Sequence, residues 1–234
     1  HEPRRVVRAR MAGGAALVAA RMPAGRRLGP VLDLDVTLEA LDLAFGHVGA
    51  VQQLGIVGLG QALADPAVDR SHLVMVDGAQ GGKTIVDWDN ITDATYTTVR
   101  DTRLAALGVT EAQVQAVWLK QATPGPTAAL PAANADAYTI VSGLGSVVRT
   151  LKMRYLNLQI VFLSSRIYAG YAQPGTLNPE PFAYETGFAV KWLVEAQIAQ
   201  GPNGPPDARA GDLQAGIVAP WLAWGPYLWA AGAR

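Results

Sequence analysis

The sequence predicts a three-layer α/β/α domain in which helices cover both faces of a short, mainly parallel sheet. Three apolar runs have the length of strands and lack alternation, as is typical of strands buried on both faces. They span residues 73–76, 114–121 and 158–163. A stretch with helical periodicity separates the second run from the third. The order strand, helix, strand favours parallel pairing through a right-handed crossover.

Composition indicates a globular chain. The 234 residues are 50% hydrophobic and 16% charged, which excludes a disordered protein. The formal net charge is zero, so the overall charge gives no reason to expect nucleic acid as a partner. Cysteine is absent, and no apolar run approaches the roughly 20 residues of a membrane helix. We therefore predict no nucleic-acid partner, no membrane span, and neither a metal nor a cofactor.

Residues 1–64 are predicted to be a poorly patterned basic extension of an α/β domain at 65–234. Residues 1 to about 30 are rich in arginine, alanine and glycine, and their only acid is Glu2. Glycines and Arg21 interrupt the apolar part, so the segment is a poor match to a targeting peptide, and we interpret it as a flexible arm. Leucines at helical spacing then predict one short amphipathic helix near residues 34–45, followed by a glycine-rich connection.

The clearest helix signal follows the second strand. Asn134 or Asp136 can cap its start. Apolar residues at spacings of three and four predict its buried face: Ile140, Leu144, Val147, Val148, Leu151 and Tyr155. Gly143 and Gly145 lower the helix propensity, and we expect them to let a neighbouring element approach closely.

A second helix is predicted to start within residues 178–181, where proline is tolerated in the first turn, and to end near Gln200. We expect this helix to bury three side chains: Phe188, Trp192 and Ala196. Residues 201–212 are predicted to be a polar loop. Residues 221–229 are aromatic, show neither helix nor strand periodicity, and are predicted to be a loop that packs a domain edge.

A glycine-rich turn follows the first predicted strand, and both main functional hypotheses depend on it. It closes with Gly82, Lys83 and Thr84, as a phosphate-binding P-loop does. The spacing departs from that motif, because Asp77 stands where the first glycine belongs and its charge repels phosphate. A nucleotide-binding protein that uses the Gly78–Thr84 loop remains an alternative function.

The same turn resembles a signature block of the SGNH (GDSL-type) hydrolase superfamily, in particular its carbohydrate-esterase branch. The resemblance lies in Gly81 and Gly82 followed by Ile85 and Trp88. Further stretches are similar to bacterial proteins of that superfamily: residues 117–122, 163–171 and 184–192. Together the similar segments cover about residues 65 to 229.

The resemblance implies a flavodoxin-like fold and a metal-independent serine esterase that acts on small-molecule or carbohydrate esters. It also implies a secreted or periplasmic location. In the family, a backbone N-H of the glycine block helps hold the oxyanion of the ester under attack. Gln121 ends the strand that carries an asparagine in the family, so it is the candidate for a side-chain amide donor.

The chain departs from the family at the catalytic positions. The family's nucleophilic serine stands on the first strand, whereas only Ser71, at the start of a strand, precedes Gly81 here. The family's catalytic Asp and His lie near the C-terminus, whereas no histidine follows His72. We therefore predict a domain truncated at its C-terminus, with unassigned catalytic residues and little or no esterase activity. A non-catalytic interaction module is the remaining alternative.

Polar side chains end the third strand: Ser164, Ser165 and Arg166. The guanidinium of Arg166 can hold a carboxylate of a ligand or pair with Glu185. Asp87 and Asp89 are interpreted as solvated acids at the start of a helix, because no histidine accompanies them as a metal ligand. The sequence thus gives four oxyanion or binding candidates: Gly81, Gly82, Gln121 and Arg166.

Overall fold

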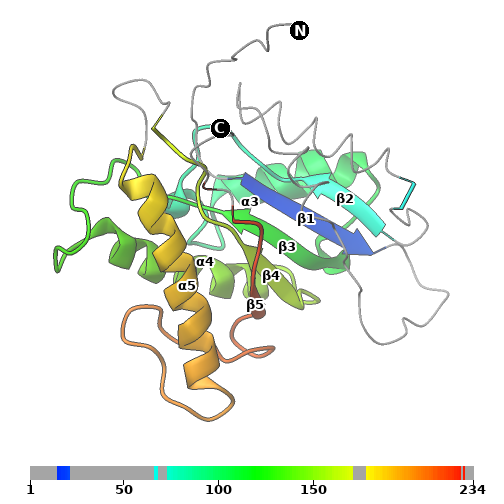
Figure 1. Cartoon of the computed structure of the whole chain (residues 1–234). Coiled ribbons are helices and arrows are strands. Elements are labelled where there is room, and N and C mark those ends of the chain that lie inside the picture. Colours follow the sequence, from blue (N-terminus) through cyan, green and yellow to red (C-terminus); the bar gives the residue numbers. More distant parts are fainter. Residues whose placement is uncertain (1–14, 22–65, 68–72, 171–177, 228, 230–234) are drawn as a thin grey trace, which may run out of the picture.

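A computed structural model describes residues 15–21, 66–67, 73–170, 178–227 and 229 of the chain. The helix predicted near residues 34–45 lies outside the described residues, as do Ser71 and all the histidines. The described residues form a mixed α/β fold built on one sheet (Figure 1).

The sheet has five strands in the order β2-β1-β3-β4-β5. Their bounds are Ala15–Arg21 for β1, Leu73–Asp77 for β2, Val114–Lys120 for β3, Ile160–Leu163 for β4 and Trp221–Trp224 for β5. β3, β4 and β5 pair in parallel, which confirms the parallel pairing predicted for the second and third runs. β1 is antiparallel to both of its neighbours, β2 and β3.

Two segments predicted to lack regular structure contribute strands. Residues 15–21 form β1 inside the sheet, so the prediction of a flexible basic arm is wrong for this part of the extension. Trp221–Trp224 forms β5, so the prediction of an aromatic loop is wrong there as well. A four-residue strand at a sheet edge needs only one partner, and its pairing with β4 is invisible to periodicity.

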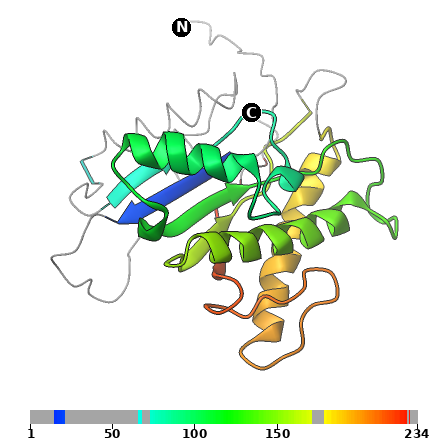
Figure 2. The ribbon, with the colours of Figure 1, turned by 180° about the vertical axis from the view of Figure 1, so that it is seen from behind.

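Two helices of equal length connect the parallel strands. α4 (Asp136–Arg154) joins β3 to β4, and α5 (Phe182–Gln200) joins β4 to β5. Because both connections step across the sheet in the same direction, right-handed crossovers carry both helices to one face. α4 and α5 pack against each other. Figure 2 shows α4 and the shorter helix that begins with α3 (Ala94–Thr98) crossing that face of the sheet.

The buried face predicted for the first long helix is confirmed in α4. Ile140, Leu144, Val147, Val148 and Leu151 all lie in the main hydrophobic core, together with Tyr155, which follows the helix. The predicted cap is wrong, because Ala135 occupies the N-cap position. The Asp136 carboxylate instead accepts a hydrogen bond from the Thr123 hydroxyl, at 2.6 Å and 2.7 Å to its two oxygens.

The burial predicted for α5 is wrong for Phe188, which is 37% exposed. Trp192 and Ala196 are partly buried and pack against the main hydrophobic core. Ala189, Val190 and Leu193 lie in the main core, and Ala183 forms a second, smaller cluster with Ala169. Apolar residues occur nearly all round this helix, so several stripes fit a helical period equally well. The aromatic stripe stacks at the surface, with the Phe188 and Trp192 rings 5.8 Å apart between centroids.

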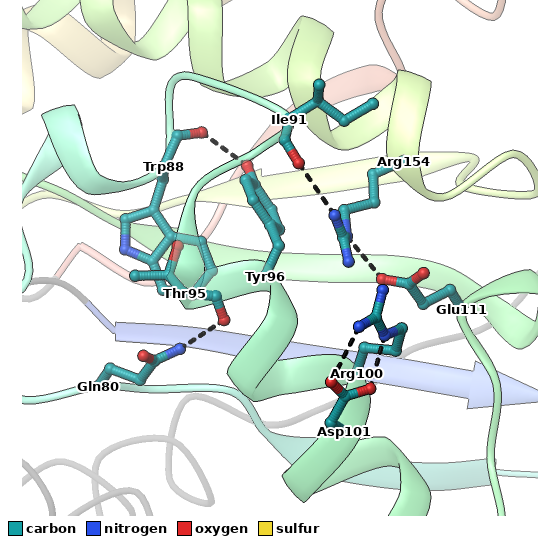
Figure 3. A network of polar contacts seen from close by, with 9 residues as sticks. All are labelled: Gln80, Trp88, Ile91, Thr95, Tyr96, Arg100, Asp101, Glu111 and Arg154. Atoms are coloured by element: carbon teal, nitrogen blue, oxygen red, sulfur yellow. Dashed lines mark hydrogen bonds and ion pairs between the residues drawn. The ribbon is translucent and has the colours of Figure 1, made fainter.

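Polar contacts join parts of the segment after the glycine turn to one another and to the end of α4 (Figure 3). The Tyr96 hydroxyl donates to the Trp88 carbonyl oxygen at 2.6 Å, and both side chains are buried. Arg154 at the end of α4 pairs with Glu111 at 2.6 Å and donates to the Ile91 carbonyl oxygen at 3.0 Å. This network holds the segment between the glycine turn and β3 against the end of α4.

The helical glycines permit close packing, as the sequence predicted. A Cβ at Gly145 would overlap the Ala210 carbonyl oxygen, which belongs to the loop before β5. That oxygen also accepts a hydrogen bond from Arg149 at 2.5 Å, so it is held in place. A Cβ at Gly143 would instead lie 2.6 Å from the terminal methyl group of Ile85, which can rotate away.

We expect Gly145→Ala to lower the free energy of unfolding by about 1–3 kcal/mol, because a fixed backbone oxygen must move. Gly143→Ala is the matched control, since the same substitution meets only a side chain and gains up to about 1 kcal/mol of helix propensity. Urea denaturation of both variants measures the difference. Equal stabilities of the two variants would contradict the packing of the 207–213 loop on α4.

Candidate functional site

The carboxyl ends of four strands meet at one edge of the sheet. β2 and β3 are both antiparallel to β1, so they run in the same direction as each other and as β4 and β5. Leu17 of β1 is level with Asp77 on one side and with Trp118 on the other. The segments that leave this edge are residues 78–84, 121–123, 164–166 and 225–227. Ligands of α/β proteins bind at such edges.

The glycine turn lies next to the segment that follows β3. Gly81 and Gly82 are exposed, and Gly82 has a φ of 75°, a left-handed conformation that favours glycine. The Ile85 N-H donates to the Ala122 carbonyl oxygen at 2.9 Å, which joins the end of the turn to the residue after Gln121. Three of the four predicted site residues therefore lie along one short stretch of the edge.

Gln121 is a buried amide that lacks partners. Its side chain is 3% exposed, and neither Oε1 nor Nε2 has a hydrogen-bond partner among the described residues. A buried polar group without a partner costs about 1–3 kcal/mol, so native proteins rarely retain one without a reason. This amide is available to a ligand at the edge.

Lys120 precedes Gln121 and was not singled out by the sequence. It is 8% exposed, and burial lowers the pKa of its ammonium group to about 7, with a further contribution from the nearby Arg166 charge. No carboxylate forms an ion pair with it among the described residues. A lysine that directly follows the apolar run 116–119 was the signal that could have identified this position.

Arg166 lies at the end of β4 and is 3% exposed. Burial lowers the pKa of its guanidinium group to about 10, while the charge of Glu180 acts in the opposite direction. Its backbone N-H donates to the Thr186 hydroxyl of α5 at 2.8 Å. The predicted pairing with Glu185 is wrong, because Glu185 accepts from the Leu130 N-H at 2.9 Å through one oxygen and its other oxygen has no partner in the described structure.

Glu180 is the acid that faces Arg166. One of its oxygens accepts from the Ala169 N-H at 2.7 Å and from the Trp229 indole N-H at 2.9 Å. The other accepts from the Tyr184 N-H at 3.1 Å in the first turn of α5. These three donors hold the Glu180 carboxylate next to the first turn of α5.

The two serines after β4 are buried. The Ser164 hydroxyl oxygen accepts a hydrogen bond from the Trp118 indole N-H at 2.7 Å. A nucleophilic serine needs a base, normally histidine, within hydrogen-bond reach. The described ranges contain no histidine. The Ser164 hydroxyl is thus engaged by Trp118, and no described histidine lies beside either serine as a base.

The residues that resemble the end of a P-loop, Lys83 and Thr84, both interact with Asp87. Lys83 Nζ lies 3.0 Å from Asp87 Oδ1, and Thr84 donates to Asp87 Oδ2 through its N-H at 2.8 Å and its hydroxyl at 3.2 Å. Burial alone would raise the pKa of Asp87, but the hydrogen bonds from Thr84 and Lys83 outweigh it and keep this pKa below its ordinary value. A three-residue 3-10 helix, Ile85–Asp87, follows instead of the long helix of a P-loop.

The remaining polar candidates show no metal-binding arrangement. Asp87 is taken up by Lys83 and Thr84, and the backbone oxygen of Asp89 accepts from the Thr150 hydroxyl at 2.9 Å. Within the described residues, no three His, Cys, Asp or Glu side chains gather where they could hold a metal ion. The helices of those residues are all too short or too polar to cross a bilayer.

Comparison with known proteins adds no relative. Neither protein-family models, curated protein sequences nor solved structures give a match to this chain. The site geometry therefore carries the functional argument.

We expect Lys120→Met to raise the free energy of unfolding at pH 6 by about 2 kcal/mol or more, because it removes a desolvated charge. The folded pKa of about 7 lies below the ordinary 10.5. The buried charge therefore lowers the free energy of unfolding by its full amount below about pH 7. This destabilisation decreases as the pH rises from 7 towards the ordinary pKa. Denaturant unfolding at pH 6 and pH 10 measures this difference. Lys191→Met, which removes an exposed lysine paired with Glu195, should show no such pH dependence.

We expect ATP with magnesium to leave the melting temperature unchanged, because Asp87 occupies both Lys83 and Thr84. A thermal melt with and without the nucleotide measures this. A magnesium-dependent rise that disappears in Lys83→Ala would establish the nucleotide-binding alternative instead.

Proposed function

We propose that the chain is an SGNH hydrolase-like domain of the carbohydrate-esterase type. Its complete fold would be the three-layer, flavodoxin-like arrangement. The strand order β2-β1-β3-β4-β5 supports this proposal, because flavodoxin-like sheets have the same strand order. The antiparallel direction of β1 is a departure from that arrangement.

The proposed ligand is an acyl ester of a small molecule or carbohydrate, and its carbonyl oxygen would bind at the glycine turn. Backbone N-H groups of Gly81 and Gly82 and the amide of Gln121 are the proposed donors. The observation that carries the proposal is the unpartnered Gln121 amide, which lies one residue from the point where the glycine turn is fastened to β3. Such donors stabilise the oxyanion that develops during acyl transfer.

The proposed domain holds the ester without cleaving it efficiently. Acyl transfer by this family requires a serine and a base, and neither is assigned in this chain. Donors alone stabilise a transition state but supply no attacking group. The function is therefore ester binding with little or no intrinsic esterase activity, and the hydrolase resemblance describes ancestry.

The test supplies the missing reactive group from solution. Imidazole attacks p-nitrophenyl acetate by itself, and a site with oxyanion donors should accelerate that attack. We expect the protein alone to release nitrophenol at the rate of buffer. With imidazole, we expect a protein-dependent rate that saturates with ester, and a loss of about tenfold or more in Gln121→Leu.

Gln159→Leu is the matched control, because Gln159 is exposed and precedes β4 at the opposite edge of the sheet. It should react like the parent protein. A rate with protein and imidazole equal to that of imidazole alone would overturn the oxyanion site. Saturable hydrolysis without imidazole that a serine-directed reagent abolishes would overturn the proposed lack of intrinsic activity.

A further inference from the structure

Two cationic side chains are buried side by side at the carboxyl edge. Lys120 ends β3, and Arg166 follows β4, the parallel neighbour of β3. Both residues are more than nine-tenths buried, and the nearby charge of Arg166 opposes protonation of Lys120. Placing two like charges in a site with little water is costly unless an anion joins them.

The described acids compensate only one of these charges. Glu180 acts on Arg166, and its carboxylate is already held by the Ala169, Tyr184 and Trp229 N-H groups. Lys120 has neither an ion pair nor a side-chain hydrogen bond within the described ranges. Among the described residues, no acid therefore offsets the charge of Lys120.

Unpartnered amides independently indicate that a ligand belongs at this edge. Gln121 adjoins Lys120 and has two free polar atoms in the described structure. Asn178, which is 1% exposed, donates to the Thr123 carbonyl oxygen at 2.8 Å, yet its own Oδ1 lacks a partner in the same part of the chain.

We propose that Lys120 and Arg166 bind the carboxylate of a small organic acid, so that the ligand of this site carries a negative charge beside its acyl group. This inference rests on the proposed function, which identifies the ligand as an ester. It adds that the ester also carries a carboxylate. A single negative charge offsets Lys120, since Glu180 already faces Arg166. A planar carboxylate also matches the fork of donors that a guanidinium presents.

The test measures the binding of sodium propionate, a minimal carboxylate, at pH 6, where Lys120 is mostly protonated. Trp118 lies two residues before Lys120 on the same face of β3, so tryptophan fluorescence can follow the titration. Calorimetry provides a second measure. We expect saturable propionate binding, and no saturable binding of chloride at equal ionic strength or of propionamide, the neutral analogue.

Variants assign the binding to the cationic pair. We expect Lys120→Met to weaken propionate binding by at least tenfold and Lys191→Met, its exposed control, to leave the affinity unchanged. Propionate binding that persists in Lys120→Met would overturn the proposal. So would equal binding of propionate and propionamide by the parent protein, a comparison that needs no variant. Tighter binding of inorganic phosphate than of propionate would overturn the choice of a carboxylate.

The outcome is separable from that of the proposed function. Loss of the imidazole-dependent ester reaction with intact propionate binding would reject the oxyanion site and retain the anion site. The reverse pattern would reject the anion site alone. Gln121→Leu tests the oxyanion site in the ester reaction, and Lys120→Met tests the anion site in the propionate titration.

Discussion

The pairing of β3 with a strand on each side is the constraint on which the rest of the structure depends. β1 fixes its register on one side and β4 on the other, and this pairing aligns the ends of β2, β3 and β4. The glycine turn and the polar residues that follow β3 and β4 consequently leave the sheet at the same edge. A shift of β3 by one residue would reverse which of its side chains face the helices. The candidate site thus depends on backbone pairing before it depends on any side chain.

Desolvation gives this edge its chemical character. Lys120, Gln121 and Arg166 would each be well hydrated at a surface, but here they are buried where the apolar strands end. Burial lowers the pKa values of both cations and leaves the Gln121 amide without partners in the described structure. Such groups destabilise an empty site and interact strongly with a ligand that satisfies them. The P-loop-like residues differ, because Lys83 and Thr84 already satisfy Asp87.

Features that depend on neighbouring residues in the sequence were predictable, whereas features that depend on contacts between distant segments were not. The core stripe of α4 was predictable because its spacing is a local property, and so was the close packing permitted by Gly145. The N-cap was missed because the Asp136 carboxylate accepts a hydrogen bond from Thr123, which lies outside the helix. The exposure of Phe188 was missed because α5 is apolar nearly all round, so its neighbours in the fold determine which side chains are buried. The partner of Glu185 was missed because the backbone of Leu130 competes for it.

By itself, the sequence determined the mixed α/β class, the parallel core strands, the crossover helix and the glycine turn that follows the first predicted strand. Hydrophobic periodicity and turn-forming residues encode these features within short stretches. Only the tertiary structure decided that residues 15–21 enter the sheet, that Trp221–Trp224 forms its edge, and that Lys120 is buried beside Arg166. Strand pairing and desolvation join residues that are far apart along the chain, and no local pattern records which segments will meet.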